Sequence, residues 1–254
     1  MNKVTAVIIT KNEERNLARC LQSLQGVADE ILIIDSFSKD RTLAIAGEYG
    51  ARVIQKEWMG YGPTKNFGNE NAKYDYILSL DADEALSEEL AASLIAEKKQ
   101  LIRPAYAMKR LLNYCGHWIR HGGFYPDRKI RLFDRRQLKW SDDPVHETLL
   151  PGTKALRKEI KELNGDLYHY SYHSVSDHMD RINRYSGLAA QKLMSRRHPG
   201  WHMLLNPSWR FFSSFVLKGG FLDGYPGYLL CRIQAFEVFL KYAKARQLRK
   251  SGRF

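Results

Sequence analysis

Residues 76–84 read YILSLDADE, and an earlier stretch, residues 4–14, reads VTAVIITKNEE. Each is a short, mostly apolar run that turns abruptly polar. Such runs are typical of strands that are buried on both faces of a parallel sheet. In open α/β sheets, ligands bind just beyond the carboxyl ends of the strands. The two stretches therefore indicate the fold class and also the edge of the sheet at which a site is expected.

The rest of the first hundred residues alternates between helical and strand patterns. Apolar residues at helical spacing in 14–25 are followed by the strand pattern EILIID at 30–35. The cycle then repeats, which predicts helices at 40–49, 63–72 and 87–98 and strands at 51–55 and 76–80. Strict alternation of this kind implies right-handed βαβ units. We therefore expect an α/β protein with an open, mostly parallel, doubly wound sheet.

The pattern changes after Pro104. Residues 105–111 and 129–134 are expected to be strands, separated by a long polar loop, CGHWIRHGGFYPD. Helical spacing returns at Ser174 and again from about Gly227. We divide the chain into an α/β half over 1–100, a continuation of the same domain over 101–173, and a basic, mainly helical C-terminal extension over 174–254.

Charge is distributed unevenly over the 254 residues, whose formal net charge is +12. Residues 1–100 contain 12 Lys and Arg against 16 Asp and Glu, so the positive excess belongs to residues 101–254. This favours a polyanionic partner such as nucleic acid, acidic lipid or a phosphorylated substrate, although surplus cations can also serve solubility alone. The chain has no apolar run of roughly 20 residues, and its three cysteines form no CxxC. We expect a cytoplasmic protein that does not span a membrane.

Asp81 and Asp83 directly follow the strand at 76–80. Side chains two apart in an extended chain point the same way, so both carboxylates can face one cation. Mg²⁺ and similar ions are commonly held by one or two carboxylates together with substrate phosphates. The alternative is an acidic turn before the helix at 87–98, since carboxylates favour helix N-termini. The position at the end of a buried strand favours a site for Mg²⁺ or Mn²⁺.

Short polar residues follow the first two strands at the same edge: Thr10, Asn12 and Glu13 after one, and Asp35 after the other. They can hydrogen-bond the base and ribose of a nucleotide, or alternatively cap the helices that follow. Lys65 lies in the Gly-rich stretch GYGPTKN, which lacks the pattern of a P-loop, and no GxGxxG follows the first strand. Nucleoside triphosphatase and dinucleotide dehydrogenase functions are thereby disfavoured.

The motifs VIITKNEE, ILIIDSFSKDRT and LSLDADE together resemble those of the family 2 glycosyltransferases, which have a GT-A fold. Within that family, GHWIRHGGFYPDRKIRLFDRR, DPVHE and GGFLDGYPGY are similar to bacterial transferases that add glucose to the inner core of lipopolysaccharide. The resemblance implies inverting, metal-dependent transfer from UDP-glucose. It also implies donor binding by residues 1–100, and acceptor binding and catalysis by residues 101–173.

Residue by residue, the resemblance implies that Asp83 is the direct metal ligand. Asp81 would belong with Asp83 to the motif that binds the metal and the diphosphate, and Thr10, Asn12, Glu13 and Asp35 would line the nucleotide. Independently of the resemblance, Lys65 is a candidate for approaching the diphosphate of the donor. Ser36 stands where many members carry a second acidic residue, which leaves the preference for uridine open.

An inverting transfer needs a base that takes a proton from the acceptor hydroxyl. The segment DDPVHE at 142–147 offers Glu147 as our candidate, with Asp143 next and Asp142 as a further rival. His146 would complete the metal shell or hold the diphosphate. The alternative is a solvated loop with a structural histidine.

Arg128 and Arg131 lie in or beside the strand at 129–134 and are candidates for binding a phosphorylated acceptor, because Arg recognises phosphate bidentately. Alternatively, they are simply the charged positions of a half-exposed strand. Aromatic and basic residues mix in the C-terminal extension, which suits the surface of an anionic membrane or else the core of that extension.

We therefore expect a peripheral enzyme on the inner face of the bacterial inner membrane, acting on a lipopolysaccharide core sugar. Other donors or glycan acceptors stay open, as does a nucleotidyltransferase that would release pyrophosphate. A basic nucleic-acid-binding module would explain the net charge, but residues 1–100 are acidic and no such motif is present. We expect no nucleic acid partner.

Overall fold

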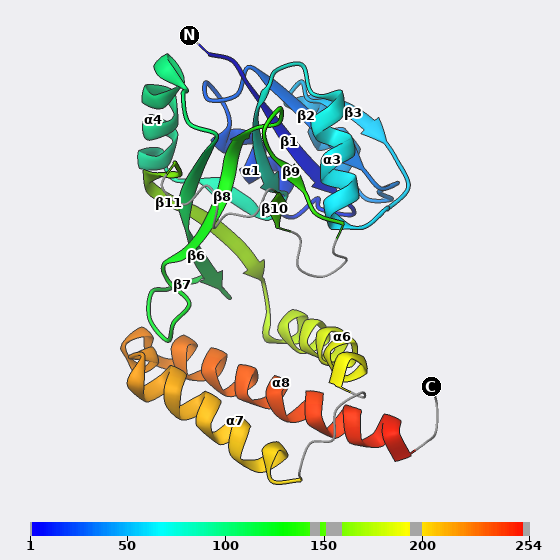
Figure 1. The fold of residues 1–254 in the computed structure, drawn as a ribbon, viewed down its shortest axis with the longest axis vertical. Helices are drawn as coiled ribbons and strands as arrows, with labels where there is room; N and C mark the ends of the chain where they lie inside the picture. Colours follow the sequence, from blue (N-terminus) through cyan, green and yellow to red (C-terminus); the bar gives the residue numbers. More distant parts are fainter. Residues whose placement is uncertain (1, 143–147, 151–158, 194–199, 251–254) are drawn as a thin grey trace. The chain divides into compact units, whose positions relative to one another are not determined.

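The computed structural model describes residues 2–142, 148–150, 159–193 and 200–250 (Figure 1). It divides into two compact units. The first comprises Met1–Arg110 and Asp127–His169, and the second comprises Leu111–Pro126 and Tyr170–Phe254.

The first unit is built on a mixed sheet with β1 (Val4–Thr10) in its interior. β1 pairs in parallel with β2 (Glu30–Asp35) and β4 (Tyr76–Asp81), and β2 pairs with β3 (Arg52–Gln55). Beyond β4 the sheet continues with β8 (Asp127–Asp134), β6 (Ala105–Tyr114), β11 (Lys161–Tyr172) and β5 (Glu84–Leu86). The predicted α/β class and the helical C-terminal region are confirmed, while the pairs β4–β8, β6–β8 and β11–β5 are antiparallel.

Strand β1 is buried along its whole length because both faces of the sheet are covered. Ala6 and Ile8 belong to one apolar cluster, and Val7 and Ile9 belong to another. The first cluster contains side chains of α1 (Leu17–Ser23), α2 (Thr42–Glu48) and α4 (Glu88–Glu97). Helix α3 (Tyr61–Asn71) contributes Phe67 to the second. This two-sided burial explains the continuous apolar runs of the parallel strands.

The parallel register brings the strand ends together. Thr10 at the end of β1 pairs with Asp35 at the end of β2, and Ile9 pairs with Asp81 at the end of β4. The polar residues that follow these strands therefore emerge at one edge, as the sequence predicts.

Several short or irregular elements were not anticipated from the sequence. They are β5, β7 (His117–Ile119), β9 (Lys139–Trp140), β10 (Leu149–Leu150), β11 and α7 (His202–Phe212). Strand β11 contains Gly165 at φ +92°, where an added Cβ would lie 2.3 Å from the backbone nitrogen of Leu90. A glycine in a strand weakens the apolar alternation but permits this close approach to α4. The predicted loop CGHWIRHGGFYPD holds β7, which forms a hairpin with β6.

The second unit is mainly helical. Helix α8 (Gly224–Lys250) packs against α6 (Val175–Leu193) and α7, and α7 leads into η2 (Ser213–Leu217) and η3 (Gly220–Asp223). The carboxylate of Asp223 accepts hydrogen bonds from the backbone nitrogens of Arg120 and His121 and lies 2.8 Å from His121 Nδ1. The motifs GHWIRHGG and GGFLDGYPGY are thus joined in space.

Gly68 sets how closely α3 approaches the sheet, because a Cβ there would lie 2.5 Å from Val7 Cγ1 and 3.0 Å from Ile34 Cγ1. We expect Gly68→Ala to lower the free energy of unfolding by about 1–3 kcal/mol, although Ala is the better helix former. Gly47→Ala in α2 is the matched control, since nothing lies within 4 Å of its added Cβ. Urea denaturation of both variants tests this. A Gly68→Ala protein as stable as the Gly47→Ala protein would contradict it.

Candidate active site

The loops after β1 and β2 are tied together around Asp35. Its carboxylate is buried and accepts hydrogen bonds from Thr10 Oγ1 at 2.9 Å and from the backbone nitrogen of Ser38 at 2.9 Å. Asn12 has a left-handed backbone, with φ of 57°, and its Oδ1 accepts a hydrogen bond from the Lys39 backbone nitrogen at 2.8 Å. The structure therefore brings Thr10, Asn12 and Asp35 together at the carboxyl edge of the sheet.

Glu13 lies in the same loop and is held by its backbone nitrogen, which donates to Thr42 Oγ1 at 2.8 Å. Burial raises the pKa of Glu13, and the carboxylates of Asp83, Asp40 and Asp81 raise it further, outweighing the hydrogen bond from Asn16. Glu13 thus experiences the negative charge of the two aspartates that follow β4, although it stands on the loop after β1.

Asp81 is held between two cations. Its Oδ1 lies 2.9 Å from Lys65 Nζ on α3, and its Oδ2 lies 2.7 Å from an Arg131 guanidinium nitrogen on β8. Burial alone would raise the pKa of Asp81, but Lys65 and Arg131 hold it well below its ordinary value. The side chain of Lys65 is only 1% exposed, and its ammonium group also lies 4.9 Å from the centre of the Trp140 ring.

Glu84 extends this ion-pair network into the interior and was not identified from the sequence. It is fully buried, lies 2.6 Å from Arg131 and 3.3 Å from Arg110, and accepts a hydrogen bond from the Asp81 backbone nitrogen at 3.1 Å. Arg110 also pairs with Asp127 at 2.7 Å. No local sequence pattern predicts these ion pairs, because the paired residues stand on three different strands, β5, β6 and β8.

Asp83 follows β4 by two residues and faces His169 on β11, with 3.3 Å between Oδ2 and Nε2. His169 too was missed as a site residue, because β11 is far from β4 in sequence. Among the described residues, no group of three His, Cys, Asp or Glu side chains forms a ready-made metal cage. The carboxylate oxygens of Asp81 and Asp83 are nevertheless the donor type that Mg²⁺ and Mn²⁺ prefer, and such ions take their remaining ligands from phosphates and water.

The two arginines expected to bind the acceptor differ in their surroundings. Arg128 is exposed and lies 2.5 Å from Glu162, whereas Arg131 is only 5% exposed and pairs with Asp81 and Glu84. The structure therefore places Arg131 inside the network rather than on the surface. Of the predicted catalytic segment, Asp142 is exposed, while Asp143, His146 and Glu147 lie outside the described residues.

Phe37 is another residue that sequence reasoning did not single out for a role. It follows Asp35 by two positions, has a left-handed backbone with φ of 56°, and is 50% exposed. A left-handed conformation costs a residue with a side chain roughly 1–2 kcal/mol, and such strain concentrates at functional sites. An aromatic residue within the polar turn DSFSKD is the signal that could have drawn attention to it.

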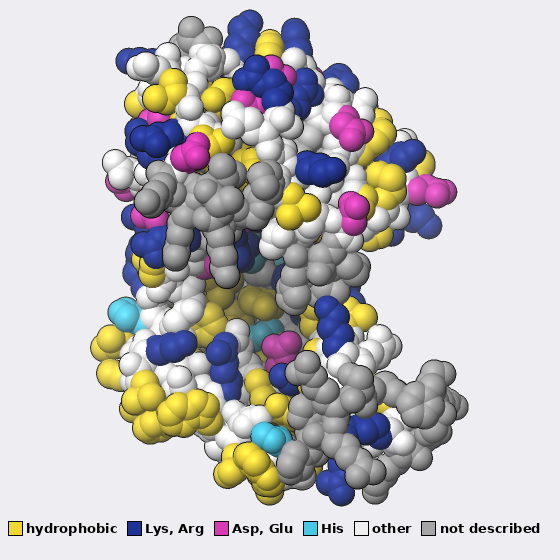
Figure 2. Space-filling view, viewed as in Figure 1, with side chains coloured by type: hydrophobic (Ala, Val, Ile, Leu, Met, Phe, Trp, Pro, Cys, Tyr) yellow, Lys and Arg dark blue, Asp and Glu magenta, His cyan; other side chains and the backbone are white. Residues whose placement is uncertain are grey.

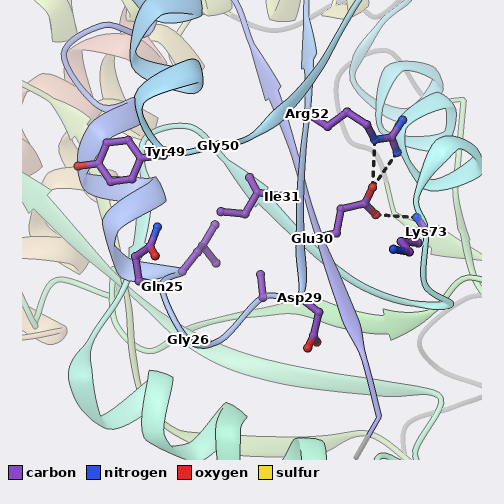
Figure 3. A pocket seen from close by; sticks show the side chains of 11 residues that line it. Gln25, Gly26, Asp29, Glu30, Ile31, Tyr49, Gly50, Arg52 and Lys73 are labelled. Atoms are coloured by element: carbon purple, nitrogen blue, oxygen red, sulfur yellow. Dashed lines mark hydrogen bonds and ion pairs between the residues drawn. The ribbon is translucent and has the colours of Figure 1, made fainter.

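A hollow of about 630 Å³ lies near the opposite ends of the strands, around the start of β2 (Figure 3). Figure 3 shows Arg52 reaching the Glu30 carboxylate, which also accepts a hydrogen bond from the Lys73 backbone nitrogen. Asp29, on the same rim, lies 2.7 Å from Lys98 Nζ. Because its carboxylates are matched by cations, and because it faces away from the carboxyl edge, this hollow is not our candidate site.

Lys65→Met is expected to lower the free energy of unfolding by about 1–3 kcal/mol at neutral pH, because it removes the buried cation from the partly exposed Asp81 carboxylate and leaves only Arg131 to pair with it. The lowered pKa of Asp81 means that the pair stabilises the fold above the ordinary carboxyl pKa of about 4 and that this stabilisation is lost as pH falls below it. The difference from wild type, measured by urea denaturation at neutral pH and at about pH 3, should therefore be smaller at the lower pH and should continue to shrink as the pH falls further.

The exposed Lys73 provides the control for that prediction, and Lys73→Met should stay within about 0.5 kcal/mol of wild type. An equal loss for Lys65→Met at both pH values would show that packing, and not the charge of Asp81, is responsible.

Comparison with known proteins identifies the family of this chain. Residues 5–146 match the family described as glycosyl transferase family 2. An uncharacterized glycosyltransferase of Rickettsia typhi is 32% identical, over 100% of this chain and 90% of its own length. The lipopolysaccharide core biosynthesis glycosyltransferase LpsC of Rhizobium meliloti is 28% identical, over 96% of this chain and 92% of its own.

Solved structures agree on the fold. The mannosyltransferase PcManGT from Pyrobaculum calidifontis, in complex with GDP-Man and Mn²⁺, superposes with a TM-score of 0.55 at 14% identity, covering 96% of this chain and 87% of its own. Residues 1–349 of S. aureus TarS in complex with UDP superpose with a TM-score of 0.53 at 16% identity, covering 99% and 92%. This chain is therefore a glycosyltransferase and belongs to glycosyl transferase family 2, with the GT-A type of fold.

Proposed function

We propose that this enzyme transfers glucose from UDP-glucose to a sugar of the lipopolysaccharide inner core, with inversion and with the help of Mg²⁺ or Mn²⁺. The observation that carries the proposal is the meeting of Thr10, Asp35 and Asp81 at the carboxyl ends of β1, β2 and β4. The nearly full-length similarity to LpsC, which is named for lipopolysaccharide core biosynthesis, supports the class of acceptor.

The donor occupies the edge formed by these strand ends. Thr10, Asn12, Glu13 and Asp35 hold the nucleoside, and the exposed ring of Phe37 stacks on its base. Ser36, where many relatives have an acid, is buried, so the base is recognised mainly through the neighbouring side chains and through stacking. Lys65 and Arg131 hold Asp81 ionised and in place. Because the Lys65 side chain is buried, its charge acts on the diphosphate through Asp81 and not by direct contact.

The divalent ion would be held by Asp83, with His146 as a further ligand. When bound, it neutralises the negative charge that develops on the leaving diphosphate. Burial, and after it the negative charge of Asp83, Asp40 and Asp81, raises the pKa of Glu13, and a bound cation would offset that negative charge. His169 orients the Asp83 carboxylate from β11.

The acceptor hydroxyl attacks the anomeric carbon of glucose while the bond to the diphosphate breaks on the opposite face. Glu147 takes the proton of that hydroxyl, with Asp143 and then Asp142 as the alternatives within the same segment. The exposed Arg128 binds a phosphate group of the acceptor, exchanging its contact with Glu162 for the stronger anion. Arg131 is assigned to positioning Asp81 instead.

A lipopolysaccharide core is anchored in lipid, so the enzyme works at the cytoplasmic face of the inner membrane as a peripheral protein. Within the described residues, no helix is both long and apolar enough to cross a membrane.

Asp83→Asn should fold normally and yet lose metal-dependent hydrolysis of UDP-glucose and transfer to a defined core acceptor, because it removes a charged ligand from an open site. Asp180→Asn, at an exposed position of α6, is the control and should behave as wild type. Activity is measured over a titration of Mn²⁺ and Mg²⁺, with GDP-mannose and UDP-GlcNAc as competing donors. Wild-type activity of Asp83→Asn at limiting metal would refute the role assigned to Asp83. Faster turnover of GDP-mannose or UDP-GlcNAc than of UDP-glucose would show that glucose is not the transferred sugar.

Glu147→Gln should depress turnover by roughly 10²–10⁴-fold while donor affinity stays almost unchanged, because the amide cannot accept the proton of the acceptor. Glu70→Gln, exposed on α3, is the matched control. Turnover and UDP-glucose affinity are measured separately, by transfer kinetics and by calorimetry. If Asp143→Asn abolishes transfer while Glu147→Gln retains it, the base is Asp143.

A further inference from the structure

Helix α7 and the short elements after it present a row of apolar side chains to solvent. In the described residues of α7, none is buried. Further exposed apolar side chains stand on η2 and η3. The exposed fractions of the main residues are Leu204 65%, Leu205 58%, Trp209 62%, Leu217 61%, Phe221 52% and Leu222 61%. Figure 2 shows hydrophobic side chains gathered over α7. We call these six residues, with Trp201, Phe212 and Tyr225, the apolar face.

Two other aromatic residues of the same segment, Phe211 and Phe215, are only partly exposed and pack against α8. The rings of Phe211 and Phe215 stack with their centres 5.2 Å apart, and both meet the Tyr228 ring edge-on. Leu230 and Cys231 of α8 are fully buried. The side chains that pack against α8 are therefore different from those of the apolar face, except that the Phe221 ring also meets that of Phe215.

The charges around the apolar face are almost all positive. Residues 201–236 contain Arg210, Lys218 and Arg232 against a single acid, Asp223. That acid is occupied by its hydrogen bonds with Arg120 and His121. A second copy of this chain would bring the same cations to the contact, whereas a bilayer with anionic headgroups offers both an apolar interior and opposite charge.

We propose that the apolar face inserts into the headgroup and acyl boundary of an anionic bilayer, with Lys218 and Arg232 binding lipid phosphates. Trp and Tyr side chains suit this depth, because their rings are apolar and their polar atoms stay hydrated. This proposal rests on the proposed function only for the identity of the membrane, which would be the bacterial inner membrane.

The basic residues near the end of α8 could also be expected to bind an anionic membrane, but Lys244 is engaged elsewhere. Lys244 donates hydrogen bonds to the backbone oxygen of Asn183 at 2.6 Å and to Ser186 Oγ at 2.9 Å, so its ammonium group is engaged within the unit. Attachment is therefore assigned to the apolar face and not to Lys244.

The test is sedimentation of the full chain with vesicles of phosphatidylcholine, with and without phosphatidylglycerol. Wild type should bind the anionic vesicles, and Leu205→Ser combined with Trp209→Ser should weaken this binding roughly tenfold or more. Lys218→Gln and Arg232→Gln should each weaken it about fivefold, and only at low salt. Ile102→Ser is the matched control, since Ile102 is 68% exposed on the first unit.

Circular dichroism and hydrolysis of UDP-glucose without lipid should be the same for all variants, which separates this proposal from the proposed function. Absence of wild-type binding to anionic vesicles would overturn the proposal. Unchanged vesicle binding of the double variant would also overturn it. So would analytical ultracentrifugation that shows wild type as a dimer and the double variant as a monomer.

Discussion

The Asp81 carboxylate, fixed between Lys65 and Arg131, is the interaction on which this edge of the molecule depends. It joins the end of β4 to helix α3 on one side and to β8 on the other. Arg131 also pairs with the buried Glu84, so the turn after β4 is fixed at both Asp81 and Glu84. Asp83, two residues further, is thereby presented at the same edge as the loops after β1 and β2. A turn that is fixed by ion pairs in this way would give the proposed donor a preorganised place to bind.

Sequence patterns predicted the parallel half of the fold, because strands such as β1 and β4 are buried on both faces and leave continuous apolar runs. They predicted the strand-end residues of the site for the same reason. They missed β11, in which Gly165 interrupts a half-exposed strand, and they missed the partners of Asp81. Arg131 shows why: its sequence neighbours suggest a charged surface strand, and only the pairing of β8 with β4 brings it to the carboxylate.

The second unit illustrates a different limit of sequence reasoning. Phe211 and Phe212 are adjacent in the chain, yet Phe211 stacks on Phe215 while Phe212 is 45% exposed. A helix with apolar residues on most of its circumference does not reveal which side will be covered. The packing of α8 decides it, and only then does a distinct apolar face become visible. The proposed donor site and the proposed membrane-binding face therefore lie on separate units of the chain.

The most direct measurement of the central claim is a crystal structure of the enzyme with UDP and Mn²⁺, with anomalous diffraction used to locate the metal. We expect a manganese peak beside Asp83, the diphosphate near Lys65 and the uracil against Phe37. Nucleotide bound instead in the hollow around Glu30 and Arg52, or manganese bound away from Asp83, would contradict it.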